Sequence, residues 1–263
     1  MKRVMEKIFR MLDLQDVRSK KQFGSERTTK LSIYHTKTGN YYLPTDAHDD
    51  IIANTIIDGK VFENEIVDLA SKYIKPNTIV LDVGANFGQM SVLFSDMVGE
   101  NGKVHSFEAD PWIYEILNKN IIENDKIGKI IPHFGAVYNI DDETLIFPEQ
   151  NFEEFGSYGS YGIDFNAKEG RKVKTITIDS LHIEEPISFL KIDIQGGDLQ
   201  AMQGAIETIE RNKMPIIFEY EYQFEDRFNL CFQDYIDFVQ SINYKFHKVI
   251  YGQNFLIIPR TEK

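Results

Sequence analysis

The sequence predicts an α/β fold in which a mostly parallel sheet is flanked by helices. From residue 62 onward, segments with the period of helices alternate with short apolar runs typical of buried strands, as in consecutive βαβ units. The chain has 263 residues, which suits one sizeable α/β domain with its own core. The last two strand-like runs form an antiparallel hairpin rather than another βαβ unit.

Five apolar runs are predicted to be the parallel strands. They cover residues 78–83, 103–107, 129–137, 189–194 and 215–220. His133 makes the third run the least regular of the five. Residues 245–251 and 255–259, joined around Gly252 and Gln253, predict the terminal hairpin.

Helices are predicted between these strands. Asp110 is an N-cap residue type, and Pro111 takes the first helical position. Residues 89–98 and 235–242 predict two further helices. The buried faces expected for three others are Ile66, Leu69, Ala70 and Tyr73; Ile113, Ile116 and Leu117; and Leu199, Met202, Ile206 and Ile209.

Two regions depart from the alternation. Residues 1–61 predict an amino-terminal extension made of a helix and short strands, and residues 62–263 predict the main domain. Within that domain, residues 144–147 and 172–178 predict a β-hairpin inserted around residues 138–187.

Composition limits the function and the location. The formal net charge of −12 argues against a surface that holds nucleic acid, because phosphate binding needs clustered Lys and Arg. Cys231 is the only cysteine, so an intrachain disulfide is excluded and a cytoplasmic location is favoured. No apolar run approaches the roughly 20 residues of a membrane-spanning helix.

The stretch VLDVGANFGQ, residues 80–89, is the first functional signal. Gly84 and Gly88 let the backbone of a strand-to-helix turn come close to a ligand. The spacing lacks the middle glycine of the dinucleotide fingerprint. Asp82, two positions before the first glycine, would repel a phosphate and attract an ammonium group. These residues favour the amino-acid end of S-adenosyl-L-methionine, with a merely tight turn as the alternative.

A second acid follows the second predicted strand. Glu108 stands where a carboxylate can accept hydrogen bonds from both hydroxyls of a ribose. An adenosyl group and NAD both carry such a ribose, so Glu108 supports a nucleotide-type cofactor without choosing between the two. A solvated acid at the end of a strand is the alternative.

Four segments resemble the FkbM family of S-adenosylmethionine-dependent methyltransferases. They are FENEIV, LDVGANFGQMSVLFS, VHSFEADP and FLKIDIQGGDLQAMQGA, and the resemblance runs from about residue 60 to 220. It implies a class I methyltransferase fold, which is Rossmann-like, with a seven-stranded sheet whose last strand is antiparallel. It also implies methyl transfer, usually to a hydroxyl oxygen.

The resemblance also implies which residues contact the cofactor. They are Glu65, Asp82, Gly84, Ala85, Asn86, Gly88, Glu108, Ala109 and Ala136. This chain departs from the family at two positions: Gln195 stands where members commonly have Glu, and Asp198 where a second Glu is usual. An amide takes up no proton at neutral pH, so a role as a base is in doubt at position 195.

Methyl transfer to a hydroxyl asks for a group that accepts the hydroxyl's proton. Asp193, at the carboxyl end of the fourth predicted strand, is the first candidate for that base or for positioning the acceptor; hydrogen bonding to the Gly196-Gly197 turn is its alternative role. Glu219 and Glu221, after the fifth strand, are second candidates, with solvated strand-end acids as the alternative.

Two further clusters have structural as well as functional explanations. The segment TDAHDD, residues 45–50, is explained by an N-cap or by a cation site. Tyr158 and Tyr161 lie in a glycine-rich segment that is either a lid over a sugar ring or a surface loop. The histidines lack metal-type spacing, so no metal site is expected.

The leading hypothesis is therefore an O-methyltransferase that acts on a hydroxyl of a saccharide, glycan precursor or similar small metabolite. Nucleic acid is not expected as a partner, and the sequence permits a homo-oligomer. A nicotinamide-dependent oxidoreductase is one alternative. A methyltransferase-like scaffold that binds the cofactor without turnover is the other, and Gln195 is the residue that keeps it open.

Overall fold

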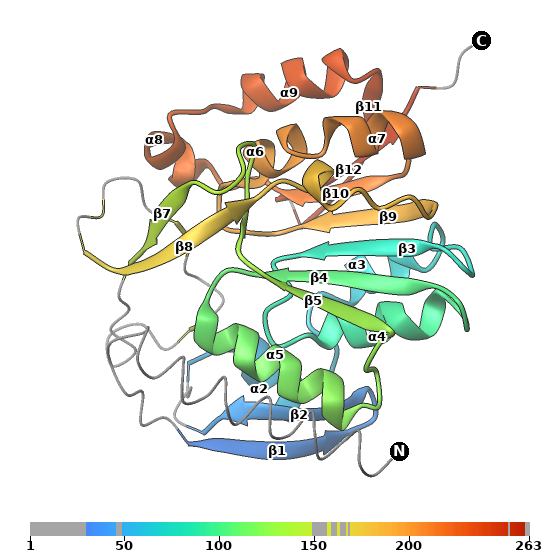
Figure 1. Ribbon diagram of the computed structural model, residues 1–263, viewed down its shortest axis with the longest axis vertical. Helices are drawn as coiled ribbons and strands as arrows, with labels where there is room; N and C mark the ends of the chain where they lie inside the picture. Colours follow the sequence, from blue (N-terminus) through green and yellow to red (C-terminus); the bar gives the residue numbers. More distant parts are fainter. Residues whose placement is uncertain are drawn as a thin grey trace. The chain divides into compact units, whose positions relative to one another are not determined.

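A seven-stranded sheet forms the centre of the unit Leu31–Lys263 in the computed structural model (Figure 1). The structure describes residues 30–45, 49–148, 157–158, 162–163, 167, 169–251 and 253–260. The expected amino-terminal helix lies outside these residues, and the predicted domain boundaries remain predictions.

The strand order confirms the predicted sheet. From one edge to the other, it is β11 (Tyr244–Ile250), β12 (Asn254–Pro259), β10 (Ile216–Glu219), β9 (Ile187–Ile192), β3 (Ile79–Val83), β4 (Lys103–Glu108) and β5 (Ile130–Phe134). The last strand of the chain, β12, is antiparallel to both of its neighbours. The pairs from β10 to β5 are all parallel.

Helices cover both faces of this sheet. On one face lie α2 (Ile51–Ile57), α3 (Asn64–Ala70), α4 (Gln89–Met97), α5 (Pro111–Glu123) and the hairpin of β1 (Leu31–Thr36) and β2 (Gly39–Pro44). On the other lie α6 (Asp198–Gln203), α7 (Ile206–Asn212) and α9 (Phe232–Ser241). The short helix α8 (Glu225–Phe228) precedes α9. In the described part of the chain, no helix has the length and apolarity needed to cross a membrane.

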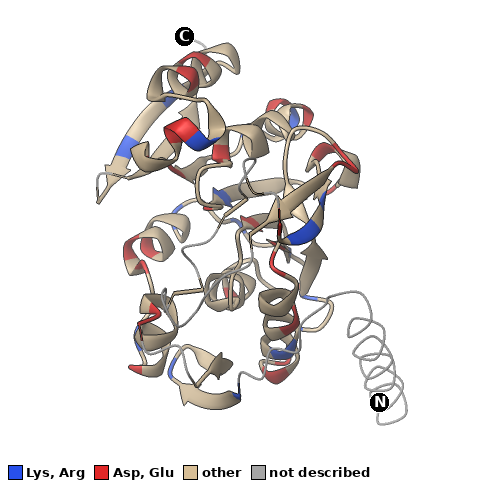
Figure 2. Ribbon diagram, turned by 90° about the vertical axis from the view of Figure 1, so that its left-hand side faces the viewer, with Lys and Arg blue, Asp and Glu red and all other residues tan. Residues whose placement is uncertain are grey.

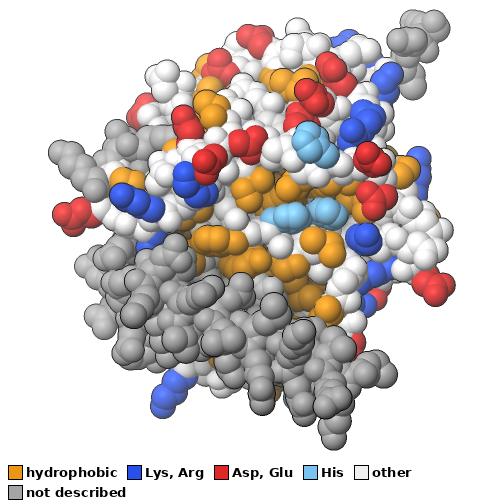
Figure 3. Space-filling model, in the orientation of Figure 1, with side chains coloured by type: hydrophobic (Ala, Val, Ile, Leu, Met, Phe, Trp, Pro, Cys, Tyr) orange, Lys and Arg blue, Asp and Glu red, His pale blue; other side chains and the backbone are white. Residues whose placement is uncertain are grey.

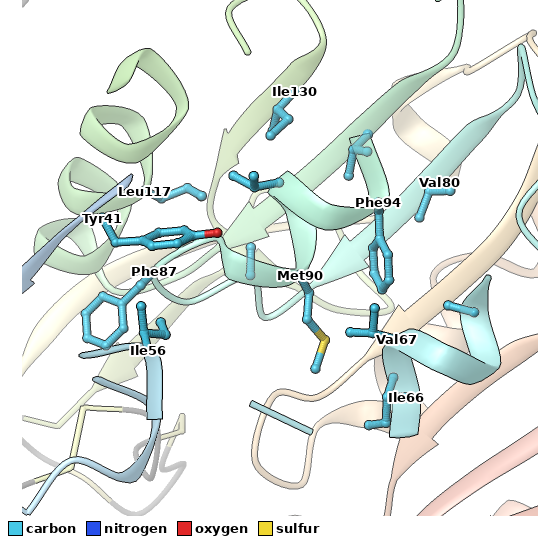
Figure 4. Close-up of a cluster of buried hydrophobic side chains, with 14 of the residues drawn as sticks. Tyr41, Ile56, Ile66, Val67, Val80, Phe87, Met90, Phe94, Leu117 and Ile130 are labelled. Atoms are coloured by element: carbon cyan, nitrogen blue, oxygen red, sulfur yellow. The ribbon is translucent and has the colours of Figure 1, made fainter. Parts of the chain in front are cut away.

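The two faces bury separate hydrophobic cores. Figure 4 shows the first core, in which Tyr41 of β2 and Ile56 of α2 lie close to Phe87. In the same core, Phe94 of α4 packs edge-on against Phe189 of β9 with ring centroids 6.2 Å apart. The second core joins α6, α7 and α9 to the alternate side chains of the same strands. Period-two alternation along the central strands therefore sorts their side chains between two layers of helices.

Asp110 caps α5 as predicted. Its Oδ1 accepts hydrogen bonds from the backbone N–H groups of Trp112 and Ile113, and Pro111 is the first helical residue. The chain therefore passes from the end of β4 into α5 within two residues, which keeps Glu108 and Ala109 at the carboxyl edge of the sheet.

The prediction of one strand over residues 129–137 is wrong. The strand β5 ends at Phe134, and β6 (Ala136–Val137) pairs with β8 (Arg171–Ile176) in a separate three-stranded sheet, which β7 (Thr144–Phe147) completes. Gly135 separates the two strands with a φ of 154°, and a Cβ there would lie 2.5 Å from Cδ1 of Ile176. The glycine lets the chain leave one sheet and enter the other.

The prediction of a single helix over residues 199–209 is also wrong. The chain forms α6 and α7, and Ile206, expected on the buried face, is 37% exposed. Gly204 ends α6, where a Cβ would lie 1.9 Å from the carbonyl oxygen of Tyr138. Asp179 accepts hydrogen bonds from the N–H groups of Glu207 and Thr208, so the second helix has its own cap.

The irregular third strand, β5, contains His133, which contacts a histidine of the neighbouring strand β4. His105 and His133 are stacked on neighbouring strands, with Nδ1 of the first 3.0 Å from Nε2 of the second. Phe107 also stacks on the ring of His133. Figure 3 shows histidine side chains among hydrophobic ones on this face of the molecule. A histidine thus takes the place of an apolar residue by packing against aromatic rings.

Candidate functional site

The candidate site lies where the strand order reverses, at the carboxyl ends of β3 and β9. The strands β4 and β5 lie on one side of this pair and β10 on the other. Gly84 follows β3 and Asp193 follows β9, and the N–H of Asp193 donates a hydrogen bond to the carbonyl oxygen of Val83 at 3.1 Å. Open α/β sheets bind their ligands at such switch points.

The turn after β3 depends on its glycines. Gly84 has a φ of 79°, and a Cβ there would lie 1.9 Å from the carbonyl oxygen of Asp193. Gly88 precedes α4 with a φ of 86°, and its Cβ would lie 2.6 Å from Leu117. Asn86 is also left-handed, with a φ of 50°. These conformations hold the backbone against the end of β9 without side chains in the way.

A cavity opens beside this turn. Its empty space is about 820 Å³, open solvent at its mouth included. Six of the predicted site residues line it: Gly84, Asn86, Glu108, Ala109, Ala136 and Asp193. The structure therefore brings together residues from the ends of four strands.

Glu108 is held in this cavity by the backbone. Its Oε2 accepts a hydrogen bond from the N–H of Asn86 at 3.0 Å, and its Oε1 accepts one from the N–H of Asp110 at 2.8 Å. Each carboxylate oxygen keeps further acceptor capacity, which two ribose hydroxyls could use. Burial raises the pKa of Glu108 to about 7.

The inserted hairpin supplies the apolar end of the cavity. Phe147 of β7 and Ile163 line it together with Ala109 and Ala136, and these side chains pack on one another. Apolar side chains of this kind suit the faces of an aromatic base such as adenine.

An ion pair joins the hairpin of β7 and β8 to Asp110, the N-cap residue of α5. The Nη1 and Nη2 atoms of Arg171 in β8 donate to the two carboxylate oxygens of Asp110 at 2.9 and 2.8 Å. The Arg171 and Asp110 side chains are only 14% and 4% exposed, and the guanidinium lies 5.2 Å from the ring centre of Phe147. The pair therefore fixes the hairpin against the start of α5.

A second, smaller cavity continues from the turn, with an empty space of about 360 Å³. Its polar lining includes Glu63, Lys191 and Asp193. Glu63 has a φ of 47°, unusual for a residue other than glycine, and its Oε1 accepts a hydrogen bond from Asn254 at 3.3 Å. Burial, with the neighbouring Asp193 carboxylate, raises the pKa of Glu63 to about 7.

Glu65 is the residue of this segment that is predicted to contact the cofactor, but its side chain lies outside both cavities. It is exposed, it lines neither cavity, and a hydrogen bond with Tyr251 lowers its pKa. Glu63, two residues earlier, has the carboxylate that faces the second cavity.

Asp82 lies beneath the turn rather than on its surface. Its side chain is fully buried; Oδ2 accepts a hydrogen bond from Ser91, and Oδ1 lies 3.6 Å from Nζ of Lys191. Ser91 also contacts the hydroxyl of Ser106 at 2.7 Å. In this position the carboxylate neutralises a buried lysine next to the site.

Lys191 links the two strands at the switch point. Its Nζ donates to the carbonyl oxygen of Gly84 at 3.0 Å and lies 3.5 Å from Oδ2 of Asp193. Burial alone would lower the pKa of Lys191, but the carboxylates of Asp193 and Asp82 outweigh burial and raise it. The lysine is therefore charged, and its charge is shared between two carboxylates.

Asp193 and Glu219 are connected through an amide. The Nε2 of Gln195 lies 3.2 Å from Oδ1 of Asp193 and 3.2 Å from Oε2 of Glu219. Asp193 lines both cavities, and Gln195 lines the larger one. Burial and the nearby Asp193 raise the pKa of Glu219 to about 10.

Two further acids, Asp198 and Glu221, lie near Asp193 and Glu219. Asp198 is fully buried, and its Oδ1 accepts a hydrogen bond from the N–H of Glu219 at 3.1 Å. Burial and then Asp193 raise the pKa of Asp198 to about 7, and the same two causes raise the pKa of Glu221. In the described residues, no group of three or more His, Cys, Asp or Glu side chains has an arrangement that could hold a metal ion.

Several residues of the site were not predicted from the sequence. Glu63, Phe147, Ile163 and Lys191 line the cavities. A lysine two positions before a strand-end acid was visible in the sequence, as KID, and could have been chosen. Phe147 and Ile163 had no such signal, because their place depends on where the inserted hairpin folds.

Residues 45–50 and the glycine-rich segment around Tyr158 have structural roles in the parts of them that the structure describes. Asp50 is the N-cap of α2 and accepts a hydrogen bond from the N–H of Ala53 at 2.7 Å. Tyr158 is buried and packs on Phe87 and Trp112. Asp46, His48 and Tyr161 lie outside the described residues.

The chain matches two protein-family models. The model described as the methyltransferase FkbM domain matches residues 82–246, more than half of the chain. The model for protein-L-isoaspartate(D-aspartate) O-methyltransferase matches residues 17–138. Both matched ranges include the glycine turn and Glu108.

Among curated proteins, the chain is similar to a protein-L-isoaspartate O-methyltransferase of Triticum aestivum. The two are 24% identical over 136 residues, 49% of this chain and 59% of the relative. It is also similar to ribosomal RNA large subunit methyltransferase E of Bdellovibrio bacteriovorus, with 37% identity over 65 residues, 25% of this chain and 33% of the relative. The matched regions thus span at most about three fifths of these relatives.

Among solved structures, the chain is similar to a methyltransferase FkbM from Methylobacillus flagellatus. The TM-score is 0.47 with 18% identity, and the match covers 70% of this chain and 44% of that chain.

Proposed function

The chain belongs to the methyltransferase FkbM domain family, and from that premise we propose that it is an S-adenosyl-L-methionine-dependent O-methyltransferase. One observation carries the proposal: the glycine turn after β3, Glu108 at the end of β4 and Asp193 at the end of β9 line the same cavity. A nucleoside donor and an acceptor hydroxyl need these groups side by side.

The residues present fit this cofactor. Glu108 would accept from the ribose hydroxyls, and the apolar end around Ala136 and Phe147 would take the adenine. Glu63, in the second cavity, is the carboxylate best situated for the ammonium group of the methionine part. Asp82 acts at a distance, because it is buried and engaged with Ser91 and Lys191.

When bound, the cofactor supplies an electrophilic methyl group and keeps the electron pair of the broken carbon–sulfur bond. The chain's own task is to hold an acceptor oxygen in line and to take up its proton. Asp193 suits this task, because it lines both cavities and its carboxylate is paired with Lys191 at 3.5 Å.

We propose a hydroxyl of a saccharide, glycan precursor or similar small metabolite as the acceptor. The Asp193 carboxylate, which lines both cavities, disfavours a phosphate group directly next to the hydroxyl that reacts. Figure 2 shows acidic and basic segments interspersed over the described helices and loops rather than gathered into a basic strip. This distribution, with the net charge of −12, disfavours nucleic acid. The single cysteine agrees with our proposal of a cytoplasmic location.

Calorimetry with S-adenosylhomocysteine and with NADH tests the cofactor. We expect the first to bind and the second not to bind; the reverse result would favour the oxidoreductase and end the proposal. Incubation with methyl-labelled S-adenosylmethionine, nucleotide sugars and cell-surface saccharide fractions tests the acceptor. Binding of S-adenosylhomocysteine with no labelled product from any fraction would instead favour the scaffold without turnover.

A further inference from the structure

The side-chain amide of Gln195 lies between the carboxyl groups of two acids. Its Nε2 is 3.2 Å from a carboxylate oxygen of Asp193 and 3.2 Å from one of Glu219. Gln195 reaches this position with a φ of 59°, a conformation that costs free energy for a residue with a Cβ. The following glycine, Gly196, lies against Phe224, where a Cβ would approach to 2.6 Å. Tight packing thus holds the strained turn and the amide between the two acids.

The charges around the two acids are unequal. Asp193 is ion-paired with Lys191, whose charge is shared with Asp82. Glu219 has no ion pair within the described part of the chain, and its nearest charged neighbours are acids: Asp193 of the β9 end, Asp198 of α6 and Glu221. Two negative charges joined by one amide, with one shared cation, repel each other strongly.

We propose that Asp193 and Glu219 hold a single proton between them at neutral pH, and that Gln195 is the positioning residue that keeps the two carboxyl groups in this arrangement. Asp193 is the ionised member, because Lys191 lies beside it. Glu219 is the protonated member. The inference rests on the proposed function only for the use of Asp193 as the base.

The surroundings of each acid support this division. Burial, with the charges of Asp193 and Glu221, raises the pKa of Glu219 to about 10. The groups that face Asp193 are Lys191 on β9, Gln195 in the following turn, Glu219 and Glu221 at the end of β10, Asp198 on α6 and Glu63 before α3. Lys191 is the cation in this set, and it lies next to Asp193.

The arrangement assigns the proton's path. If a bound cofactor supplied the methyl group and kept the electron pair of the broken carbon–sulfur bond, the acceptor's oxygen would form the new bond to carbon and its proton would pass to the Asp193 carboxylate. Asp193 then carries a neutral carboxyl group and returns the proton to solvent. Glu219 already holds a proton and cannot accept a second one, so it donates a hydrogen bond instead.

Stability measurements test the proton on Glu219 without any substrate. A carboxyl group whose folded pKa is raised contributes stability below its unfolded pKa, and this stability is lost as the pH rises through the folded pKa. Glu219→Gln cannot ionise. The folding equilibrium constant of the variant, divided by that of the unmodified protein, should therefore rise about tenfold per pH unit between pH 6 and 9.

Urea denaturation at fixed ionic strength measures this ratio. A ratio that stays constant over this range would show that Glu219 is ionised, and the inference would be wrong. Glu207→Gln makes the same change at an exposed position of α7 and serves as the matched control. The result does not depend on S-adenosylhomocysteine binding, so failure here is distinct from failure of the proposed function.

Carbon-13 NMR tests the positioning role of Gln195. In protein labelled at the glutamate side-chain carboxyl carbon, Glu219→Gln identifies the Glu219 signal. Gln195→Met removes the amide that joins the two acids but keeps a side chain of similar length. The two carboxyl groups can then separate, and because the charge of Asp193 helps to raise the pKa of Glu219, we expect the titration midpoint of Glu219 to move to lower pH. A midpoint that does not move would show that Gln195 has only a structural role in the turn.

Discussion

Gly84 shows most directly how a single residue shapes the site. Its φ of 79° is unfavourable for a residue with a Cβ, and the added atom would lie 1.9 Å from the carbonyl oxygen of Asp193. Gly84→Ala should therefore destabilise the fold by about 3 kcal/mol and abolish S-adenosylhomocysteine binding. Urea denaturation and calorimetry measure the two effects.

A matched glycine separates backbone strain from the steric contact. Gly59 has a φ of 72°, and nothing lies within 4 Å of the position of its Cβ. Gly59→Ala should cost only the strain, about 1 kcal/mol, and leave binding intact. Equal costs for the two variants would contradict the contact with Asp193.

Glu108 should make cofactor binding depend on pH. Burial raises its pKa to about 7, so the carboxylate that would accept from the ribose is protonated in a growing fraction of molecules below pH 7. Affinity for S-adenosylhomocysteine should fall by up to about tenfold per pH unit below that value. Calorimetry between pH 5.5 and 8.5 measures it.

Glu108→Gln provides the control, since its amide cannot ionise. We expect weaker binding that no longer changes with pH over this range. If the variant kept the pH dependence of the unmodified protein, another group, such as Glu63, would be responsible.

Residue types at strand ends predicted the polar part of the site, but not each side chain's direction. Gly84, Glu108 and Asp193 line the cavity because a parallel sheet brings the ends of its strands to one edge. Asp82 precedes that edge by two residues, and the alternation of the strand turns its carboxylate inward to Lys191. Sequence alone did not reveal that Glu63, rather than Glu65, faces the second cavity.

Among the helices and strands, the positions of strands and helix caps were more predictable than the points at which a strand or a helix is interrupted. The pattern at Asp110 and Pro111 predicted the start of α5, because capping depends on neighbours in the sequence. The breaks at Gly135 and Gly204 depend on Ile176 and Tyr138, which come from other segments. Nothing in the local sequence identifies those contacts.

The ion pair of Arg171 and Asp110 should decide how firmly the hairpin of β7 and β8 is attached. Arg171→Met leaves a buried carboxylate without its cation, although Asp110 keeps its bonds to the N–H groups of α5. We expect a loss of about 3 kcal/mol in unfolding free energy and weaker S-adenosylhomocysteine binding. Urea denaturation and calorimetry measure both.

A second ion pair of the same hairpin is the control. Lys174 lies 2.9 Å from Asp142, and both side chains are mostly exposed. Lys174→Met should change the unfolding free energy by no more than about 1 kcal/mol. Similar losses in the two variants would mean that the buried pair has no special role in holding the hairpin.

For the molecule as a whole, one sheet separates two hydrophobic cores. The first contains side chains of α2 to α5 and the second those of α6, α7 and α9, and the strands contribute to both. Neither layer of helices buries its apolar face without the sheet. We therefore expect the unit Leu31–Lys263 to unfold in a single transition, although the helices that pack in one core do not pack in the other.

Conservative changes in the two cores test this expectation. Ile116 of α5 is fully buried in the first core and Ile209 of α7 in the second. Each change to Val should cost about 1 kcal/mol, and the double variant should lose their sum within about 0.5 kcal/mol in one urea transition. Ile206→Val, on the exposed side of α7, should cost almost nothing. Two separate transitions, each moved by only one of the changes, would mean that the halves of the sheet fold independently.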